Sequence, residues 1–276
     1  MTLALSRQQQ IQQATEWIKE ADALLIGAGA GMGVDSGLPD FRGNEGFWKA
    51  YPALKEHNHS FSDMANPMWF KLNPRKAWGF YGHRLNLYKN TQPHEGFNIL
   101  KAWADTCLNG SMVFTSNVDG QFQKAGFREL DIMECHGSIH HLQCSQYCSD
   151  DIWSAHDLEL TIDEATLTLT SDIPRCPHCG EVARPNILMF NDGYWNPDRT
   201  DDQEDRFSQW ANQAGNILAI EIGAGTAIPS VRYKTTEIGK KIIRINPRQS
   251  VISKRYTGIS LDMGGLEALE AINDVI

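Results

Sequence analysis

Stretches with the apolar spacing of helices alternate with short apolar runs of strand length along much of the chain. Apolar residues recur at helical spacing from Ser6 to Glu20, where Ser6 is a candidate cap, and the run Leu24-Leu25-Ile26 follows at once. The alternation continues with a helix over 97–103, strands over 111–115, 132–134, 217–222 and 241–245, and a final helix over 266–272. Strands that alternate with helices predict an α/β fold with a doubly wound, Rossmann-like parallel sheet.

Two regions interrupt this alternation. Residues 44–76 place many aromatic side chains among proline and asparagine, so we expect a flexible loop that leads into short helices, and residues 77–88 predict a helix despite two glycines. Residues 139–185 are polar, and 161–170 alternate like a small hairpin strand. We therefore expect one domain, 1–276, in three parts: a parallel-sheet lobe (1–43, 89–138 and 186–276), a helical module (44–88) and an inserted small lobe (139–185).

The first strand runs directly into alternating glycines, Gly27, Gly29, Gly31 and Gly33. The absence of Cβ atoms lets a backbone turn tightly and lets a ligand approach the main chain. The ordinary dinucleotide fingerprint G-x-G-x-x-G is absent, because the glycines fall at every second position. The stretch predicts a nucleotide site of another kind, and the alternative is a tight strand-to-helix connection without a ligand.

Charge and hydropathy exclude some classes of partner. The formal net charge of −9 argues against a nucleic-acid-binding surface, whose affinity would come mainly from Lys and Arg. The chain has no apolar run near the roughly 20 residues that span a bilayer, and its start lacks the pattern of a signal peptide. We therefore expect a cytoplasmic protein with neither nucleic acid nor membrane as a partner.

Four of the six cysteines form two close pairs, Cys144-x3-Cys148 and Cys176-x2-Cys179. Two short chelate loops with four thiolates suit a closed tetrahedral zinc site. With no open coordination position, the zinc would be structural and would hold the small lobe together. A redox dithiol remains an alternative, as does a site in which His178 or His156 replaces one cysteine.

Several motifs resemble those of the Sir2 (sirtuin) family, and they occur in the order that the family uses. Gly29-Ala30-Gly31 with the segment 36–43 (SGLPDFRG) resembles the family's first signature, and Thr115-Ser116-Asn117-Val118-Asp119 resembles its TQNID motif. His136-Gly137 resembles the catalytic HG, and 184–190 resembles RPxVVxF. A glycine-rich stretch, 223–226, and Ile245-Asn246 complete the order. The resemblance implies an NAD-dependent protein lysine deacylase whose parallel-sheet lobe binds NAD.

The resemblance also implies roles for individual residues. His136 and Asn117 would be catalytic: the imidazole titrates near neutrality and can take a proton from a ribose hydroxyl, while Asn117 positions ribose or water. Asp119 would accept a hydrogen bond from the nicotinamide carboxamide, although a turn-forming role beside Gly120 is the alternative. The residues that would bind NAD are Gly29, Ala30, Gly31, Asp40, Phe41, Arg42, Ser116, Asn117, Val118, Asp119, His136, Gly223, Ala224, Gly225, Asn246 and Met263.

Substrate recognition is expected at two places. Ile187, Leu188 and Phe190 would line a cleft for an acyl-lysine protein or peptide. Tyr81 and Arg84 share a helix face and resemble the Y-x-x-R of sirtuins that remove acidic acyl groups such as succinyl or malonyl, since a guanidinium can bind a carboxylate bidentately. A solvated helix face is the alternative. In the implied mechanism, the acyl oxygen attacks the anomeric carbon of NAD, and nicotinamide, O-acyl-ADP-ribose and free lysine are the products.

Three departures from the family pattern keep other functions open. The family serine is Gly33 here, its glutamine is Ser116, and its Leu-His after the aspartate is Gln121-Phe122. An NAD hydrolase or mono-ADP-ribosyltransferase on the same fold is therefore the alternative function. A module that binds acyl-lysine or NAD without turnover is a third hypothesis, against which the intact His136 argues.

Overall fold

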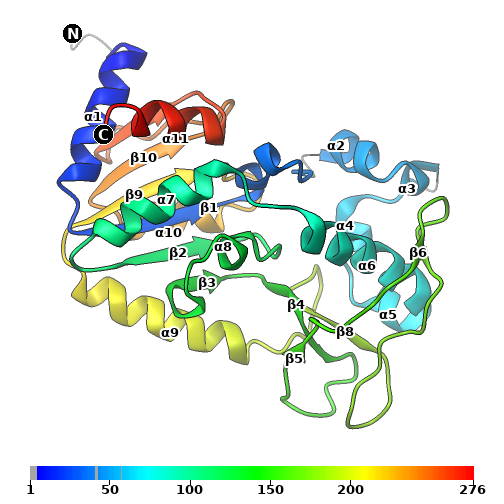
Figure 1. Cartoon of the computed structure of the whole chain (residues 1–276). Coiled ribbons are helices and arrows are strands. Elements are labelled where there is room, and N and C mark those ends of the chain that lie inside the picture. The colour runs from blue at the N-terminus through cyan, green and yellow to red at the C-terminus, as the bar shows by residue number, and fades with distance from the viewer. Residues whose placement is uncertain (1–4, 41–42, 57) are drawn as a thin grey trace.

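The computed structural model describes the backbone of residues 5–40, 43–56 and 58–276. Its larger part is a sheet of parallel strands in the order β11-β10-β9-β1-β2-β3 (Figure 1), which confirms the predicted fold class. The strands are β1 (Ala23–Ala28), β2 (Ser111–Thr115), β3 (Ile132–Glu134), β9 (Ile217–Ile222), β10 (Lys241–Ile245) and β11 (Gly258–Leu261).

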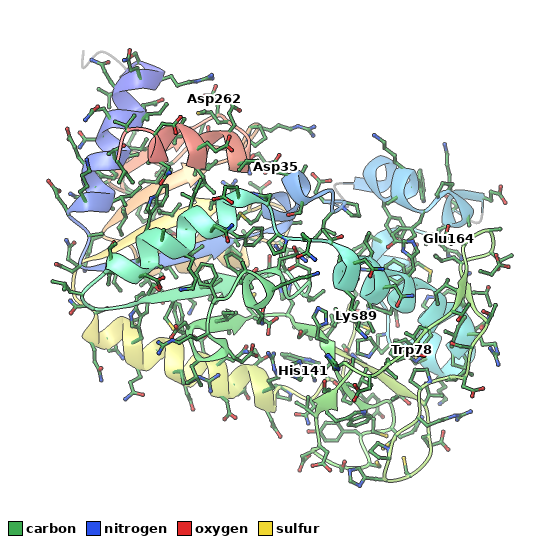
Figure 2. All side chains as sticks on the ribbon, in the orientation of Figure 1. Asp35, Trp78, Lys89, His141, Glu164 and Asp262 are labelled. Carbon is green, nitrogen blue, oxygen red and sulfur yellow. The ribbon has the colours of Figure 1, made fainter. Side chains whose placement is uncertain are left out.

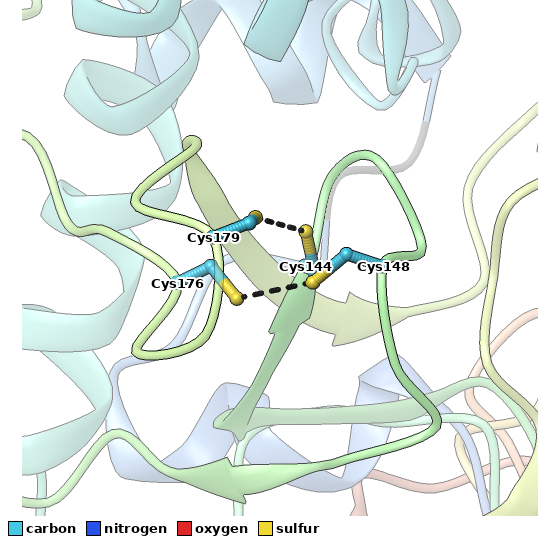
Figure 3. Close-up of side chains that lie close together, drawn as sticks. All are labelled: Cys144, Cys148, Cys176 and Cys179. Carbon is cyan, nitrogen blue, oxygen red and sulfur yellow. Dashed lines mark hydrogen bonds between the residues drawn. The ribbon is translucent and has the colours of Figure 1, made fainter.

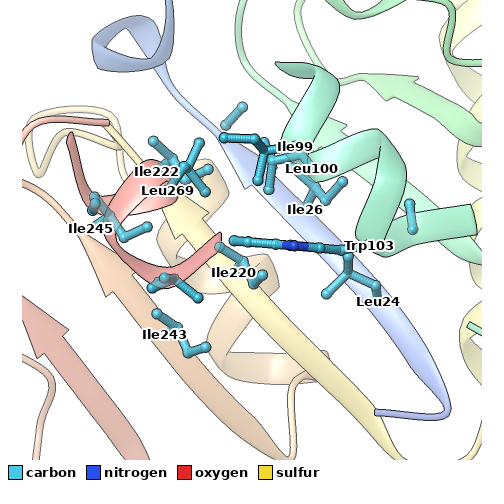
Figure 4. Packing of buried hydrophobic residues seen from close by; sticks show 14 of the residues in the cluster. Leu24, Ile26, Ile99, Leu100, Trp103, Ile220, Ile222, Ile243, Ile245 and Leu269 are labelled. Carbon is cyan, nitrogen blue, oxygen red and sulfur yellow. The ribbon is translucent and has the colours of Figure 1, made fainter. Parts of the chain in front are cut away.

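Helices cover both faces of this sheet, as a doubly wound fold requires. Leu24 and Ile26 of β1 pack with Trp103 and Leu269 on one face (Figure 4), whereas Leu25 points to the other face. This alternation follows from the two-residue period of a strand. The helices on the first face are α1 (Arg7–Lys19), α7 (Glu95–Thr106) and α11 (Gly265–Asn273), and those on the second are α9 (Asp198–Gln213) and α10 (Ser230–Ile238).

Short helices fill the connection after β1, as the sequence predicts. They lead into the long helix α6, and a cluster of aromatic rings that includes Phe47, Tyr51 and Phe80 packs them together. The elements are η1 (Ala30–Ser36), α2 (Gly43–Ala50), α3 (Pro52–Glu56), α4 (Phe61–Met64), α5 (Met68–Leu72) and α6 (Pro74–Asn90), and two further short helices, α8 (Gln121–Lys124) and η2 (Glu129–Asp131), follow β2.

A small lobe is built from antiparallel strands. One sheet has the order β5-β4-β8, and the hairpin β6-β7 lies where the sequence predicts a hairpin strand. The strands are β4 (Gly137–Cys144), β5 (Trp153–Ser154), β6 (Ile162–Asp163), β7 (Thr168–Leu169) and β8 (Ala183–Ile187).

Helix α6 anchors the small lobe. Lys89 Nζ donates to the carbonyls of Ala155, His156 and Leu158, and Trp78 Nε1 donates to Ala183 O at 2.8 Å; Figure 2 labels both side chains. The hairpin β6-β7 also lies directly on α6. In the described ranges, no helix combines the length and the apolar character needed to cross a membrane.

Candidate functional site

A cavity of about 630 Å³ opens where the loops after the parallel strands meet α6 and β8. The loops after β1, β2, β3 and β9 all contribute to it, because the carboxyl ends of parallel strands lie at one edge of the sheet. The predicted site residues that line the cavity are Gly29, Ala30, Asp40, Tyr81, Arg84, Ser116, Asn117, Val118, Asp119, His136, Ile187, Leu188, Phe190, Gly223 and Gly225.

Other predicted NAD-binding residues lie behind this lining. Gly31 N donates to Gly223 O at 3.1 Å, and Asn246 Nδ2 donates to Ala224 O at 3.0 Å. These residues support the loops whose neighbours face the cavity, and Met263 is buried in the core. Two residues of the prediction lie outside the described part of the chain: Phe41 and Arg42.

The loops after β1 and β9 touch backbone to backbone, which explains their glycines. A Cβ on Gly29 would lie 2.8 Å from Gly223 O. Gly223 has a φ of +63°, and a Cβ there would lie 2.4 Å from the carbonyl carbon of Gly31. Any side chain at these positions would separate the loops. The glycines therefore build the floor of the cavity from main chain alone.

Asn117 is fixed beside this floor. Its Nδ2 donates to Gly29 O at 3.0 Å, and its backbone N donates to Thr115 Oγ1 at 3.0 Å. Thr115 Oγ1 in turn donates to Ala28 O. These bonds tie the end of β2 to the end of β1, so the Asn117 amide is held in one orientation.

Asp119 forms the turn that the sequence offered as one alternative, and its side chain also lies at the cavity. Its Oδ1 accepts from Gln121 N at 3.0 Å, which forms the turn before α8, and the same carboxyl group lines the cavity. Burial raises the pKa of this carboxyl to about 6, while the charge of Arg84 acts in the opposite direction. A carboxylate that is costly to ionise is common at functional sites.

His136 follows β3 and borders the cavity. Burial lowers the pKa of its imidazole below the usual value, and a hydrogen bond with the Ser116 backbone opposes that shift. The ring is therefore neutral at neutral pH, the form that can accept a proton. The His136 carbonyl accepts from Leu188 N at 3.0 Å, so the histidine loop is joined to the predicted substrate segment.

Tyr81 and Arg84 are buried on α6, with 1% and 5% of their surface exposed, which excludes a solvated helix face. The guanidinium carbon of Arg84 lies 5.4 to 5.7 Å from the ring centroids of four aromatic side chains, Phe61, Phe80, Tyr81 and Tyr88. The Tyr81 hydroxyl has no hydrogen-bond partner among the described residues, although it is buried. Burial raises its pKa to about 12, so it stays a neutral donor.

The predicted substrate segment is held by a buried ion pair between Arg184 and Asp192. Arg184 Nη2 donates to Ile187 O at 2.7 Å, and Met189 N donates to Asp192 Oδ2 at 3.2 Å. Leu188 and Phe190 remain more than one-third exposed beside the cavity. The segment thus offers exposed apolar side chains on a fixed backbone.

Some lining residues were not predicted from the sequence. Tyr88 carried a signal, because it lies four residues after Arg84 and so on the same helix face. Leu38, Pro39 and Met189 lie within the motif segments 36–43 and 184–190, so the sequence did point to them. The other positions carried no signal, since they depend on how short helices and loops pack around the cavity; they are Ser60, Phe61, Ser62, Ala65, Ala227 and Ile228.

The four paired cysteines converge between the end of β4 and the segment before β8 (Figure 3). Their sulfur atoms all lie within 4.8 Å of one another, with 3.6 Å between the sulfurs of Cys144 and Cys179 and 3.5 Å between those of Cys148 and Cys176. Tetrahedral zinc with Zn–S bonds of about 2.3 Å separates its sulfurs by about 3.8 Å, so the donor set fits a structural zinc ion.

The alternative in which His178 or His156 replaces a cysteine is not what the structure shows. His178 pairs with Asp151 and His156 pairs with Asp157, and neither histidine belongs to the sulfur cluster. A dithiol would need two cysteines, whereas the fold gathers four from both ends of the predicted insertion. Zinc is therefore the expected occupant, and its role is to close the lobe.

The arrangement of these motifs around one cavity agrees with the match to known proteins. A model of the Sir2 family matches residues 29–215, which is more than half of the chain. The chain belongs to the Sir2 family. The matched range begins at the glycine loop and includes His136 and all four cysteines.

Individual relatives are similar at modest identity. NAD-dependent protein deacylases from Pyrococcus abyssi and Aquifex aeolicus are 28% and 27% identical to this chain, over 82% of it and over 82% and 84% of the relatives. Among solved structures, a Sir2 homologue in complex with NAD has a TM-score of 0.70 at 24% identity, covering 96% of this chain and 93% of the other. Sir2 bound to acetylated peptide has a TM-score of 0.68 at 17% identity, with coverages of 96% and 98%. Both share the fold of this chain.

The three departures from the Sir2 pattern lie in different surroundings. Ser116 lines the cavity. Gly33 is buried, and a Cβ there would lie 3.1 Å from Leu38 Cδ1. Phe122 packs in the core against Phe97, with 4.9 Å between ring centroids. Of these three, Ser116 alone is part of the described cavity lining.

Proposed function

We propose that this protein is an NAD-dependent protein lysine deacylase. The observation that carries the proposal is the convergence of His136, Asn117, Asp119 and two glycine loops on one cavity, in a chain of the Sir2 family. The names of its relatives support the same activity. Acyl-lysine proteins or peptides would be the substrates, and nicotinamide, O-acyl-ADP-ribose and free lysine the products.

NAD fits the lining of the cavity. Backbone at Gly29 and Gly223 would let its phosphates approach closely, and the Asp119 carboxylate would accept from the carboxamide of nicotinamide. When bound, NAD supplies an electrophilic sugar carbon and a leaving group. Asn117 would orient the ribose or a water molecule from its fixed position beside Gly29.

His136 would act as the general base. Its neutral imidazole would take the proton of a ribose hydroxyl, so that the hydroxyl oxygen attacks the acyl carbon. The segment 187–190 would align the peptide so that its acyl-lysine enters the cavity, since the Arg184–Asp192 pair holds this backbone in place. Water would be the third reactant: nicotinamide would leave the sugar carbon, the acyl group would end on a ribose hydroxyl, and the lysine amine would be released free.

Mass spectrometry of the products from NAD with acetyl-lysine and succinyl-lysine peptides tests the proposal. Free lysine peptide together with O-acyl-ADP-ribose is the expected result. Plain ADP-ribose formed without any peptide, or ADP-ribose attached to a protein, would instead identify an NAD hydrolase or an ADP-ribosyltransferase. Ser116, at the cavity where the family has glutamine, is the feature that favours that alternative.

The acyl preference we propose is for acidic groups such as succinyl or malonyl. The buried charge of Arg84 and the unpartnered hydroxyl of Tyr81 support it, because an acetyl pocket has no use for either. Arg84→Met should lower activity on succinyl-lysine by one to two orders of magnitude, the worth of a charge-assisted hydrogen bond of roughly 1.5–3 kcal/mol. Activity on acetyl-lysine should be retained or rise, and equal losses on both peptides would contradict the preference.

A further inference from the structure

Arg84 is held by a second residue of its own helix, Tyr88. Both Nε and Nη2 of the guanidinium donate to Tyr88 Oη, at 3.1 and 3.0 Å. The two residues lie four apart on α6 and both line the cavity. Tyr88 is itself 5% exposed, so the pair is out of bulk water.

This contact uses one defined edge of the guanidinium. An arginine presents its N–H donors in a rigid planar fork, and a carboxylate can meet either the Nε–Nη2 edge or the Nη1–Nη2 edge. Tyr88 occupies the first edge, so a carboxylate that binds bidentately is kept from that edge. The hydroxyl therefore determines which side of Arg84 a ligand meets.

The partner is also neutral. Burial raises the pKa of the Tyr88 hydroxyl, so it holds the guanidinium through hydrogen bonds without cancelling the positive charge. Four aromatic rings surround the same guanidinium, and their faces tolerate a cation. Because a flexible arginine loses rotamer freedom when it binds, a guanidinium that is already fixed loses less.

We propose that Tyr88 is a specificity-determining residue that positions Arg84 for the carboxylate of an acidic acyl-lysine. The inference rests on the proposed deacylase function and its acidic-acyl preference. Tyr88 acts through Arg84. Its hydroxyl should therefore affect the binding of acyl groups with a distal carboxylate and should leave the binding of acetyl-lysine unchanged.

Tyr88→Phe removes the hydroxyl and keeps the ring that packs on Arg84. We expect KM for a succinyl-lysine peptide to rise about tenfold with kcat little changed, and kcat/KM for the matched acetyl-lysine peptide to stay within about twofold of wild type. Tyr233→Phe is the matched control, since this tyrosine on α10 is 69% exposed and outside the cavity lining. It should leave both peptides unaffected, and melting temperatures verify that each variant is folded.

A double-mutant cycle separates positioning from a structural role. In an Arg84→Met background, Tyr88→Phe should no longer change the ratio of succinyl to acetyl activity, because the hydroxyl has lost the group it orients. Equal losses on both peptides in the single variant, an unchanged ratio, or the same shift with and without Arg84 would each overturn the inference.

The same measurements separate the role of Tyr88 from the proposed deacylase function and its acyl preference. If wild type deacylates no peptide, the proposed function fails. If it processes acetyl-lysine alone, the acidic-acyl preference and the role of Tyr88 fail while the deacylase function stands. If it processes both peptides and Tyr88→Phe leaves their ratio unchanged, the role of Tyr88 alone fails.

Discussion

Asp119 shows how one side chain serves the fold and the site at once. It forms the turn before α8 by accepting from Gln121 N, and it also lines the cavity. Ionising its carboxyl group is costly because burial raises the pKa to about 6. A buried carboxyl that is ionised at neutral pH lowers the free energy of unfolding, a cost that is expected where the charge serves a function.

Asp119→Asn should therefore stabilise the protein at neutral pH. The folded-state pKa lies above the ordinary value of about 3.9, so wild-type stability falls as pH rises toward 6, and the asparagine removes this loss while its Oδ1 can still accept from Gln121 N. Thermal melts should show the variant above wild type at pH 7.5, with a difference that shrinks toward pH 4. A difference independent of pH would refute the assignment. Inhibition by nicotinamide should weaken, since an amide presents donors as well as an acceptor.

The sequence predicted most of the residues that line the cavity. Residues such as His136, Asn117 and Asp119 belong to short motifs that occur along the chain in the same order as in the Sir2 family. The sequence could not indicate Ser60 or Ala65. Ala65 reaches the cavity through a contact between distant segments, in which Phe190 N donates to Ala65 O at 2.9 Å. No local pattern encodes that contact.

Among the elements, buried strands were predicted best. β1 is a continuous apolar run, and β2, β9 and β10 are mostly apolar although β9 contains Glu221 and β10 contains Arg244; this is typical of strands buried on both faces. Helix α9 had no such signal, because its buried positions include the polar Thr200 and Gln203. Gln203 Oε1 accepts from the backbone N of Glu134, so a polar side chain replaces the expected apolar one.

The glycines of α6 are explained by packing that the sequence alone does not reveal. A Cβ on Gly79 would lie 1.9 Å from Leu167 O in the hairpin β6-β7, whereas a Cβ on Gly82 would meet side-chain methyl groups of Ile162 and Leu160 at 3.0 and 3.1 Å. Backbone cannot move aside as easily as the end of a side chain. Gly79 is therefore a position at which the hairpin backbone lies directly against the helix.

Gly79→Ala should destabilise the protein by about 1–3 kcal/mol, the usual cost of overpacking. Gly82→Ala is the matched variant, and its smaller clash is partly offset by the roughly 1 kcal/mol that alanine gains over glycine in a helix. Unfolding in denaturant measures both. Equal stabilities would show that the hairpin is not held against α6 as described.

In the whole molecule, the small lobe is stabilised by the cysteine cluster and by hydrogen bonds from helix α6, in addition to its own apolar packing. The cysteine cluster joins the end of β4 to the segment before β8, and Lys89 and Trp78 of α6 donate hydrogen bonds to the backbone of the lobe. The sequence predicted the metal site because thiolate spacing is a local signal. It did not predict the contacts with α6, and the boundaries of the three parts stay a prediction.

We expect one zinc ion per chain, and Cys176→Ser should lose it and unfold the small lobe, because the binding energy of a structural zinc is largely folding energy. Elemental analysis and hydrogen exchange over residues 139–185 provide the measurements. Cys107→Ser is the matched control, since this cysteine is the C-cap residue of α7 and is not a member of the cluster. A zinc-free wild type, or a Cys176→Ser protein with unchanged exchange, would contradict the assignment.

The central claim is that NAD cleavage is coupled to removal of an acyl group, with His136 as the base. The most direct test is the ratio of nicotinamide released to lysine peptide deacylated, measured with and without acyl-lysine peptide. We expect a ratio of about one, negligible release without peptide, and turnover reduced by roughly 10² or more in His136→Ala while NAD still binds. Nicotinamide release that does not depend on peptide, or near wild-type deacylation by His136→Ala, would contradict it.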